Sequence, residues 1–440
     1  MRGMKRQFPG GPFAFLAAVF ASFCAVADLP ELPVDIGNDH TNLVYRVGER
    51  AVFDVRVRGT NAICGKVGIR LDNFGPRTVS ETDWDPSSRR DVQVSGSLDE
   101  PGFLRMTLCA EGYREKVWSV AVDPGKIRKG SPSPADFDAF WADARARLDR
   151  EVPLDPQVVR VPERSTAAFD FHRISFATHG RRVYGYMSVP TDRAKAPYPV
   201  LFNVAAAGFG DWTNDMQGRG DMICVFFSVY PFEPDWNWRK TGLQAKYDEL
   251  NATARKACGV AHYALVGYDR SREDCFYYPV ILGISRALDW VASRPDVDPR
   301  RILYHGTSQG GAFGFWLCGL NRRITRAALF VPASTDTMGY LKGRLSGWPK
   351  PGENMPAAHE AVGRVAPYFD AANFASRIRC PIRIAVGFAD LTCPPCGVYA
   401  GFNEIRSDDK DIVHGFGMGH GCFGSIYRTL RDTWLMQEGE

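Results

Sequence analysis

The stretch that decides the fold of this chain is Arg301-Ile302-Leu303-Tyr304-His305-Gly306-Thr307-Ser308-Gln309-Gly310-Gly311. Its first four residues predict a short buried strand, and the apolar residues 312–320 that follow predict a helix. Between them lies a G-x-S-x-G pattern centred on Ser308. A serine on such a strained strand-to-helix turn exposes its hydroxyl near the N–H groups that begin the helix, where developing negative charge is favoured. We therefore predict that Ser308 is a nucleophile; the alternative is a glycine-rich turn with a structural role.

Continuous apolar runs alternate with helical stretches over residues 168–440. Such runs suit parallel strands that are buried on both faces. The alternation predicts an α/β fold with a doubly wound, mostly parallel sheet. Residues 232–279 are longer than a plain crossover needs, so we interpret them as an insertion that Cys258 and Cys275 are placed to close. The apolar runs are 200–204, 223–229, 302–304, 327–331 and 382–386, and the helical stretches are 280–293 and 311–320.

Residues 28–122 have a different texture, with six or seven short strand-like runs separated by turn residues. This pattern predicts a small all-β, sandwich-like domain. Residues 123–134 are rich in proline, glycine and serine and predict a linker, so the α/β domain is expected to span 135–440. Cys64 and Cys109 are the only cysteines of the sandwich-like domain. They either pair across it or stay as free buried thiols.

The first 27 residues resemble an export signal. Arg2, Lys5 and Arg6 precede an apolar run over 13–26, and Ala25-Val26-Ala27 is an A-x-A cleavage pattern. We predict a signal peptide at 1–27 and a secreted or periplasmic protein; the alternative is an uncleaved membrane anchor. No other segment reaches 18 consecutive apolar residues, so no integral membrane span is expected after cleavage.

Composition and charge narrow the classes of function. Hydrophobic residues make up 45% of the 440 residues and charged residues 24%, which is ordinary for a folded protein. The net charge of +4 falls to +1 once the three cations of the export signal are removed. A charge so small and so dispersed argues against a dedicated nucleic-acid binder.

A serine nucleophile needs a base, and the base needs an acid that holds its tautomer. In an α/β-hydrolase these follow in the chain order serine, acid, histidine. Of the three histidines after Ser308, His420 lies in a glycine-rich loop after the last predicted strand. His414 lies within that strand and is the main alternative, whereas His359 comes too early in the chain. We therefore predict His420 as the base.

The acid is expected in a loop that follows a strand, because such sheets carry function at the carboxyl ends of their strands. Asp390 follows the run 382–386, and Asp336 follows the run before it and is the rival. We predict Asp390. The oxyanion hole is expected to use two backbone N–H groups: that of Gln309 and that of Ala205, the latter uncertain by one position.

Several motifs follow one another in order along residues 131–440. They are Phe137-Asp138-Ala139-Phe140-Trp141, Arg286-Ala287-Leu288-Asp289-Trp290, Arg294-Pro295-Asp296-Val297-Asp298-Pro299-Arg300-Arg301-Ile302, Thr307-Ser308-Gln309-Gly310-Gly311, Tyr368-Phe369-Asp370-Ala371-Ala372-Asn373-Phe374-Ala375, Cys380-Pro381 and Asp390-Leu391-Thr392-Cys393-Pro394-Pro395. This ordered set resembles the acetyl xylan esterase / cephalosporin-C deacetylase family of carbohydrate esterases. The resemblance implies Ser308 as nucleophile, Asp390 and His420 as its partners, and Gln309 as an oxyanion donor.

The chain also departs from that family. Asn203-Val204-Ala205 stands where the family reads His-Gly-Tyr, Val229-Tyr230-Pro231 where it reads Arg-Gly-Gln, and Gly421 where it usually has Glu. These differences leave the substrate and the family's hexameric assembly open. A homo-oligomer is a possible assembly.

Two further features lie near the predicted site. Cys393-Pro394-Pro395-Cys396 is a C-x-x-C without a thioredoxin-like context and without two further metal ligands, so we interpret it as structural, with Cys422 as a candidate partner. No metal and no cofactor is expected. A cluster of aromatic residues either packs the insertion or lines a sugar-binding cleft. Its members are Trp236, Trp238, Tyr263, Tyr268, Tyr277 and Tyr278.

Taken with the resemblance, these residues predict a secreted serine carboxylesterase that removes O-acetyl groups from a polysaccharide or oligosaccharide through an acyl-enzyme on Ser308. Acetylated carbohydrate is the expected partner. Two alternatives remain: a serine peptidase of the prolyl oligopeptidase type, and a non-catalytic glycan-binding protein on a hydrolase scaffold. The sandwich-like domain is too short for the propeller of that peptidase family, and an ordered triad argues against a non-catalytic protein.

Overall fold

A computed structural model of the chain describes residues 29–60, 63–208, 218–235, 241–421 and 424–437. The predicted export signal at 1–27 lies outside this part, as do Cys422 and the two tryptophans of the insertion. Among the helices of the described residues, none is long and apolar enough to cross a membrane.

A nine-stranded sheet forms the centre of the molecule, in the order β17-β16-β15-β14-β12-β13-β11-β10-β9. Its neighbours from β17 to β13 are all parallel, whereas β11, β10 and β9 pair antiparallel at one edge. The strands are β9 (Gln157–Arg160), β10 (Phe169–Thr178), β11 (Arg181–Pro190), β12 (Tyr198–Val204), β13 (Ile223–Ser228), β14 (Val297–Thr307), β15 (Arg326–Phe330), β16 (Ile382–Gly387) and β17 (Lys410–Gly415).

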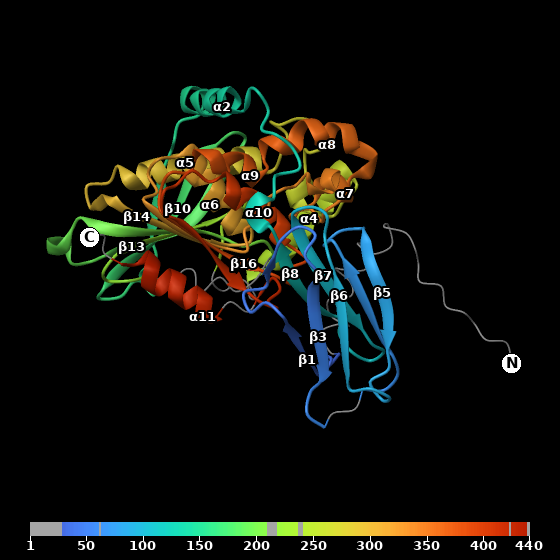
Figure 1. The fold of residues 1–440 in the computed structure, drawn as a ribbon. Coiled ribbons are helices and arrows are strands. Elements are labelled where there is room, and N and C mark those ends of the chain that lie inside the picture. Colours follow the sequence, from blue (N-terminus) through green and yellow to red (C-terminus); the bar gives the residue numbers. More distant parts are fainter. Residues whose placement is uncertain (1–28, 61–62, 209–217, 236–240, 422–423, 438–440) are drawn as a thin grey trace.

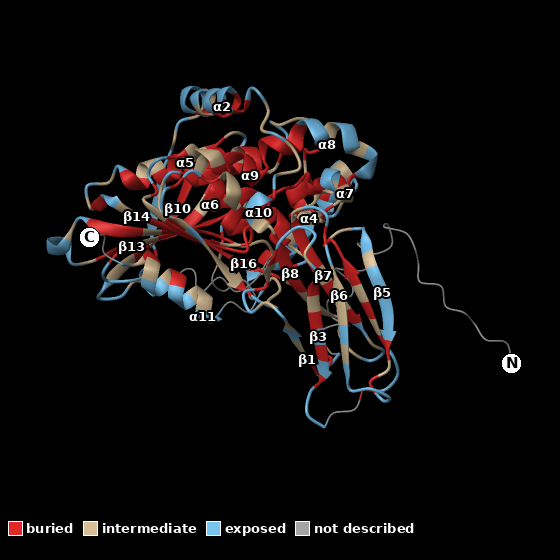
Figure 2. Cartoon of the chain, viewed as in Figure 1, coloured by how far each residue is buried: buried red, intermediate tan, exposed pale blue. Residues whose placement is uncertain are grey.

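Helices cover both faces of this sheet, with α5 and α6 on one face and α11 on the other (Figure 1). Helices α5 and α6 are buried over most of their length, as are most residues of the middle strands (Figure 2). The α-helices are α2 (Phe137–Glu151), α4 (Leu243–Cys258), α5 (Tyr277–Ala292), α6 (Gln309–Leu320), α7 (Pro351–Asn354), α8 (His359–Val365), α9 (Ala371–Phe374), α10 (Pro395–Glu404) and α11 (Gly424–Tyr427), which a π-helix, η9 (Arg428–Leu435), continues. The predicted doubly wound α/β-hydrolase fold is confirmed.

Residues 34–122, here called the N-terminal β region, form two smaller sheets, as predicted. One has the order β1-β3-β6 and the other β2-β8-β7-β4-β5. Alternating strands such as β3 turn every second side chain into a common core. The strands are β1 (Val34–Asn38), β2 (Val44–Tyr45), β3 (Ala51–Val57), β4 (Val67–Asp72), β5 (Thr78–Trp84), β6 (Asp91–Gly96), β7 (Gly102–Cys109) and β8 (Lys116–Val122).

The N-terminal β region packs near β16, on the side of the large sheet that ends with β17 (Figure 1). Hydrogen bonds cross between the two parts, from Asn73 Nδ2 to Gly343 O at 2.9 Å and from Leu345 N to Phe74 O at 3.1 Å. The outer face of β5 is exposed, whereas β7 and β8 are largely buried (Figure 2). The predicted division at 122 and 135 stays a prediction, as do the bounds of the insertion at 232–279, whose described part contains α4.

Candidate active site

Ser308 occupies the sharp turn between β14 and α6. Its φ of +56° and ψ of −116° lie outside the regions that an ordinary side chain prefers, and its N–H donates to Phe330 O at 2.8 Å. A Cβ on Gly306 would overlap the backbone of Gly310, and one on Gly310 would overlap Val204 O. The turn therefore requires glycine two residues before and two residues after the serine, as the pattern predicted.

Three predicted side chains from separate loops meet at this turn. His420 Nε2 lies 2.9 Å from Ser308 Oγ, and His420 Nδ1 lies 2.8 Å from Asp390 Oδ2. Because the carboxylate can only accept, Nδ1 donates to it, and Nε2 accepts a hydrogen bond from the serine hydroxyl. This is the tautomer that a general base needs.

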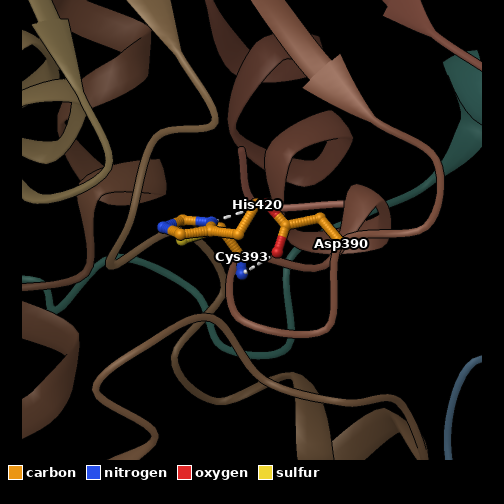
Figure 3. A group of neighbouring side chains, drawn as sticks. All are labelled: Asp390, Cys393 and His420. Atoms are coloured by element: carbon orange, nitrogen blue, oxygen red, sulfur yellow. Dashed lines mark hydrogen bonds and ion pairs between the residues drawn. The ribbon is translucent and has the colours of Figure 1, made fainter. Parts of the chain in front are cut away.

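Asp390 is fully buried in the turn after β16. Its Oδ1 accepts the N–H groups of Thr392 at 2.8 Å and Cys393 at 2.9 Å, and its Oδ2 faces His420. Three donors occupy most of the acceptor sites of this carboxylate and fix its orientation. Figure 3 shows the carboxylate between the imidazole and the backbone of Cys393.

The rival residues lie elsewhere. Asp336 is buried in an ion pair with Arg344, at 2.8 Å between Oδ2 and Nη2. His414 Nε2 lies 2.5 Å from the hydroxyl of Tyr399, and exposed His359 lies at the start of α8. Among the described residues, Ser308, His420 and Asp390 are therefore the serine, histidine and acid that the structure brings together.

The first predicted oxyanion donor is well placed. The N–H of Gln309 is the first of α6, so it has no acceptor within the helix and points out of the helix start beside Ser308.

The second predicted donor, Ala205, needs a correction. Its N–H donates to Phe227 O at 2.9 Å and continues the ladder between β12 and β13, so it is not available to an oxyanion. The N–H of Ala206 has no acceptor among the residues that the structure describes. Because the ladder runs one residue further than the apolar run indicated, we propose Ala206 as the second donor.

The side chain of Gln309 forms a clamp that the sequence did not reveal. Its Oε1 accepts hydrogen bonds from the hydroxyls of Tyr263 and Tyr277, both at 2.7 Å, and its Nε2 donates to Ala205 O at 3.0 Å. The three side chains and Ala205 are buried. The clamp joins the two segments that would carry the oxyanion donors, so it sets their separation.

We expect Tyr277→Phe to lower kcat for an aryl acetate about five- to tenfold with little change in KM. The substitution removes one of two donors to a buried amide oxygen and loosens the clamp; complete loss of an oxyanion donor costs roughly 10²–10³. Steady-state kinetics measures the effect. Tyr278→Phe is the matched control, because the Tyr278 ring packs against Phe140 on α2, away from Gln309. Equal rates for the two variants would contradict the clamp.

Asp390, Cys393 and His420 also bring three potential metal ligands within 4.8 Å of one another (Figure 3). The donor chemistry does not favour a metal there. The carboxylate oxygens already accept hydrogen bonds from the imidazole and from two backbone N–H groups. Burial, with the charge of Asp390 nearby, raises the pKa of the Cys393 thiol well above its usual range, so the thiolate that a metal needs is disfavoured.

The cysteines of the described residues are all free thiols. Cys64 and Cys109 are both exposed rather than buried, and Cys258 bonds to Ala254 O within its own helix rather than closing the insertion onto Cys275. The four tyrosines of the aromatic cluster are buried and pack the fold. Trp236 and Trp238 lie outside the described residues.

His305 lies directly beneath the elbow, one residue before Gly306. It is 5% exposed, and its ring nitrogens lie within hydrogen-bond distance of Asn203 Nδ2, at 3.1 Å, and of the Tyr427 hydroxyl, at 3.3 Å. Burial, reinforced by the charge of Arg431, lowers the pKa of His305 to about 3. The folded chain therefore keeps this imidazole neutral.

We expect the folded chain to lose stability as the pH falls below about 6.5, the ordinary histidine pKa. Below this pH the unfolded chain binds a proton at His305 and the folded chain does not. The free energy of unfolding therefore falls by up to about 1.4 kcal/mol per pH unit until the pH nears the pKa of His305 in the folded chain. In His305→Gln, the temperature midpoint of unfolding should therefore fall less steeply between pH 6.5 and pH 5 than it does in the wild type. His359→Gln, at an exposed histidine, should show the same dependence of the midpoint on pH as the wild type. Equal slopes for the wild type, His305→Gln and His359→Gln would contradict the prediction.

Comparison with known proteins places this geometry in a family. Residues 125–436 match the acetyl xylan esterase (AXE1) family. The acetyl esterase Axe7A of Xylanibacter ruminicola is 29% identical over 387 residues, which cover 85% of this chain and 84% of that protein.

Two solved structures share the fold. The acetyl xylan esterase from Paenibacillus sp. R4 aligns with a TM-score of 0.57 at 23% identity, and acetyl xylan esterase 1 from Thermoanaerobacterium sp. JW/SL YS485 with 0.55 at 19%. Each alignment covers 70% of this chain and 96% of the other.

The sheet order and the serine elbow define the class: this protein is an α/β-hydrolase. The match over residues 125–436 covers most of the chain, and the chain therefore belongs to the acetyl xylan esterase family. It is accordingly a carboxylic ester hydrolase of the carbohydrate esterase kind, as the ordered motifs indicated.

Proposed function

We propose that this protein is a serine carboxylesterase that removes O-acetyl groups from a polysaccharide or oligosaccharide through an acyl-enzyme on Ser308. The observation that carries the proposal is the continuous hydrogen-bonded series from Ser308 Oγ through His420 to Asp390, at 2.9 and 2.8 Å, in a chain of the acetyl xylan esterase family. The name of the relative Axe7A, an acetyl esterase, supports acetyl as the acyl group.

The mechanism follows from this geometry. Ser308 Oγ attacks the ester carbonyl while His420 Nε2 takes its proton, and the buried carboxylate of Asp390 stabilises the imidazolium that forms. The N–H groups of Gln309 and Ala206 bind the oxyanion of the tetrahedral intermediate. His420 then gives the proton to the sugar's ester oxygen as its bond to the acyl carbon breaks. The sugar leaves with a free hydroxyl, and an acetyl-enzyme remains.

The same residues complete the cycle with water. His420 takes a proton from a water molecule, whose oxygen attacks the acetyl carbonyl, and the proton returns to Ser308 Oγ as acetate leaves. Each step needs only protein groups and water.

Export is part of this proposal. The residues at 1–27 that predict a signal peptide would deliver the enzyme to the compartment where acetylated polysaccharide is found. N-terminal sequencing of the protein recovered from the medium or periplasm tests this, with a first residue at Asp28 expected.

Acetate release tests the proposed activity. The purified enzyme is given acetylated xylan, acetylated oligosaccharides, an aryl acetate and an unblocked peptide amide, with acetate and free amine measured separately. We expect acetate from the carbohydrates and the aryl ester and no amine from the peptide. Amine without acetate would instead favour a peptidase, and neither product would favour a non-catalytic protein.

A further inference from the structure

The N-terminal β region touches the turn that carries Asp390. Ser119, on β8, is fully buried, and its hydroxyl donates to Phe388 O at 2.5 Å. Phe388 lies between the end of β16 and Asp390, whose own N–H donates to Gly387 O at 3.3 Å. A hydrogen bond to this carbonyl therefore fixes the peptide plane inside the turn that aims the carboxylate.

The neighbouring residue of β8 touches the loop that carries His420. The indole of Trp118 lies directly on Gly417, where any Cβ would overlap the ring and where φ is +65°. Trp118 is itself held, because its Nε1 donates to Asn38 Oδ1 at 2.8 Å. Gly417 is three residues before His420, so the ring restricts the approach of that loop.

The two loops are tied together between these contacts. Ala389 N donates to Met418 O at 2.9 Å, which joins the acid turn to the histidine loop. The ring of Phe103, on β7, lies edge-to-face with Phe388 at 5.0 Å and is completely buried. Each loop thus has one side against the N-terminal β region and one side against the other loop.

A buried hydroxyl in this interface is informative. Docking two domains through apolar area needs no polar group, and a hydroxyl without a partner in such a place costs about 1–3 kcal/mol. The hydrogen bond to Phe388 O removes this penalty for Ser119, and it does so only while Phe388 O keeps its position. The contact therefore selects one position of the acid turn.

We infer that the N-terminal β region positions the catalytic acid and base, with Ser119 and Trp118 as positioning residues for Asp390 and His420. This inference rests on the proposed function of those two residues. A displacement of about 1 Å in a reacting group costs up to roughly 10²-fold in rate, so a modest change in the turn is measurable.

The test compares Ser119→Ala with Ser80→Ala, which removes an exposed hydroxyl from β5 of the same region. We expect Ser119→Ala to lower kcat for an aryl acetate about five- to twentyfold with KM unchanged, and Ser80→Ala to have no effect. Trp118→Phe, which keeps an aromatic ring but shrinks the contact with Gly417, should also lower kcat. Assays run well below the thermal midpoint of each variant, with circular dichroism as the check on folding. A kcat for Ser119→Ala within twofold of wild type would overturn the inference.

A double-mutant cycle separates positioning from general loosening. If Ser119 acts through Asp390, Ser119→Ala should change kcat by less than twofold in an Asp390→Asn background. An undiminished effect there would overturn the positioning role. Full activity of Asp390→Asn alone would instead overturn the proposed triad, so the two failures are distinguishable.

Discussion

Ser308→Ala is expected to lower kcat for an aryl acetate by about 10⁴- to 10⁶-fold with little change in KM. The hydroxyl is the only protein group that the mechanism bonds to the acyl carbon, whereas the oxyanion donors remain. What activity is left comes from water attacking a carbonyl that is still polarised. The alanine keeps the turn, because Gly306 and Gly310 still provide the space that the backbone needs.

The measurement is acetate release by purified wild type and variant, together with covalent labelling by a fluorophosphonate, which should be lost in Ser308→Ala. Ser293→Ala removes an exposed hydroxyl at the C-terminus of α5 and serves as the matched control, with unchanged rate and labelling. Retained labelling or hydrolysis in Ser308→Ala would show that a different nucleophile carries the activity.

The elbow was predictable because its signals are local. A strand, a G-x-S-x-G turn and a helix follow within twenty residues, and the turn needs glycine for reasons of space that any such backbone imposes. The fold class was predictable for a similar reason, since continuous apolar runs such as those of β12 to β16 have few other uses. Chain order and loop position then indicated His420 and Asp390, and in the structure His420 lies beside Ser308 with Asp390 on its other side.

The oxyanion loop shows where sequence reasoning stopped. Ala205 looked suitable because small residues follow the apolar run of β12, but which amide is free depends on the register with β13. That register is a property of two strands, so one strand's pattern leaves an uncertainty of one residue. Ala206 is within that uncertainty.

The supporting contacts could not be found from spacing at all. Tyr263 and Tyr277 hold Gln309 from more than thirty residues away, and Ser119 holds Phe388 across 269 positions. Their residue types suit packing as well as hydrogen bonding, so nothing in the sequence distinguishes them from ordinary core residues. A serine inside the otherwise apolar run 117–122 is the one weak signal, and it does not indicate a partner.

His420→Ala is expected to lower kcat about as far as Ser308→Ala, and the double variant no further than either single one. Without the imidazole, Ser308 Oγ has no group to take its proton, and without the hydroxyl the imidazole has nothing to activate. Residues that act as one unit are therefore strongly non-additive. Asp390→Asn should cost somewhat less, about 10³- to 10⁴-fold, because an amide in its place no longer enforces the correct tautomer of His420.

His414→Gln provides the control that separates the two histidines of this segment. His414 lies in β17 and faces the hydroxyl of Tyr399 at 2.5 Å, so its loss should alter packing and leave kcat within a few-fold of wild type. The rates of the wild type and of these five variants are compared in one aryl acetate assay, with folding checked by circular dichroism. If His414→Gln were as inactive as His420→Ala, the assignment of His420 as the base would lose its support. If the loss in the double variant equalled the product of the two single losses, Ser308 and His420 would not form one proton-transfer unit, and the base would have to be sought elsewhere at the carboxyl edge of the sheet.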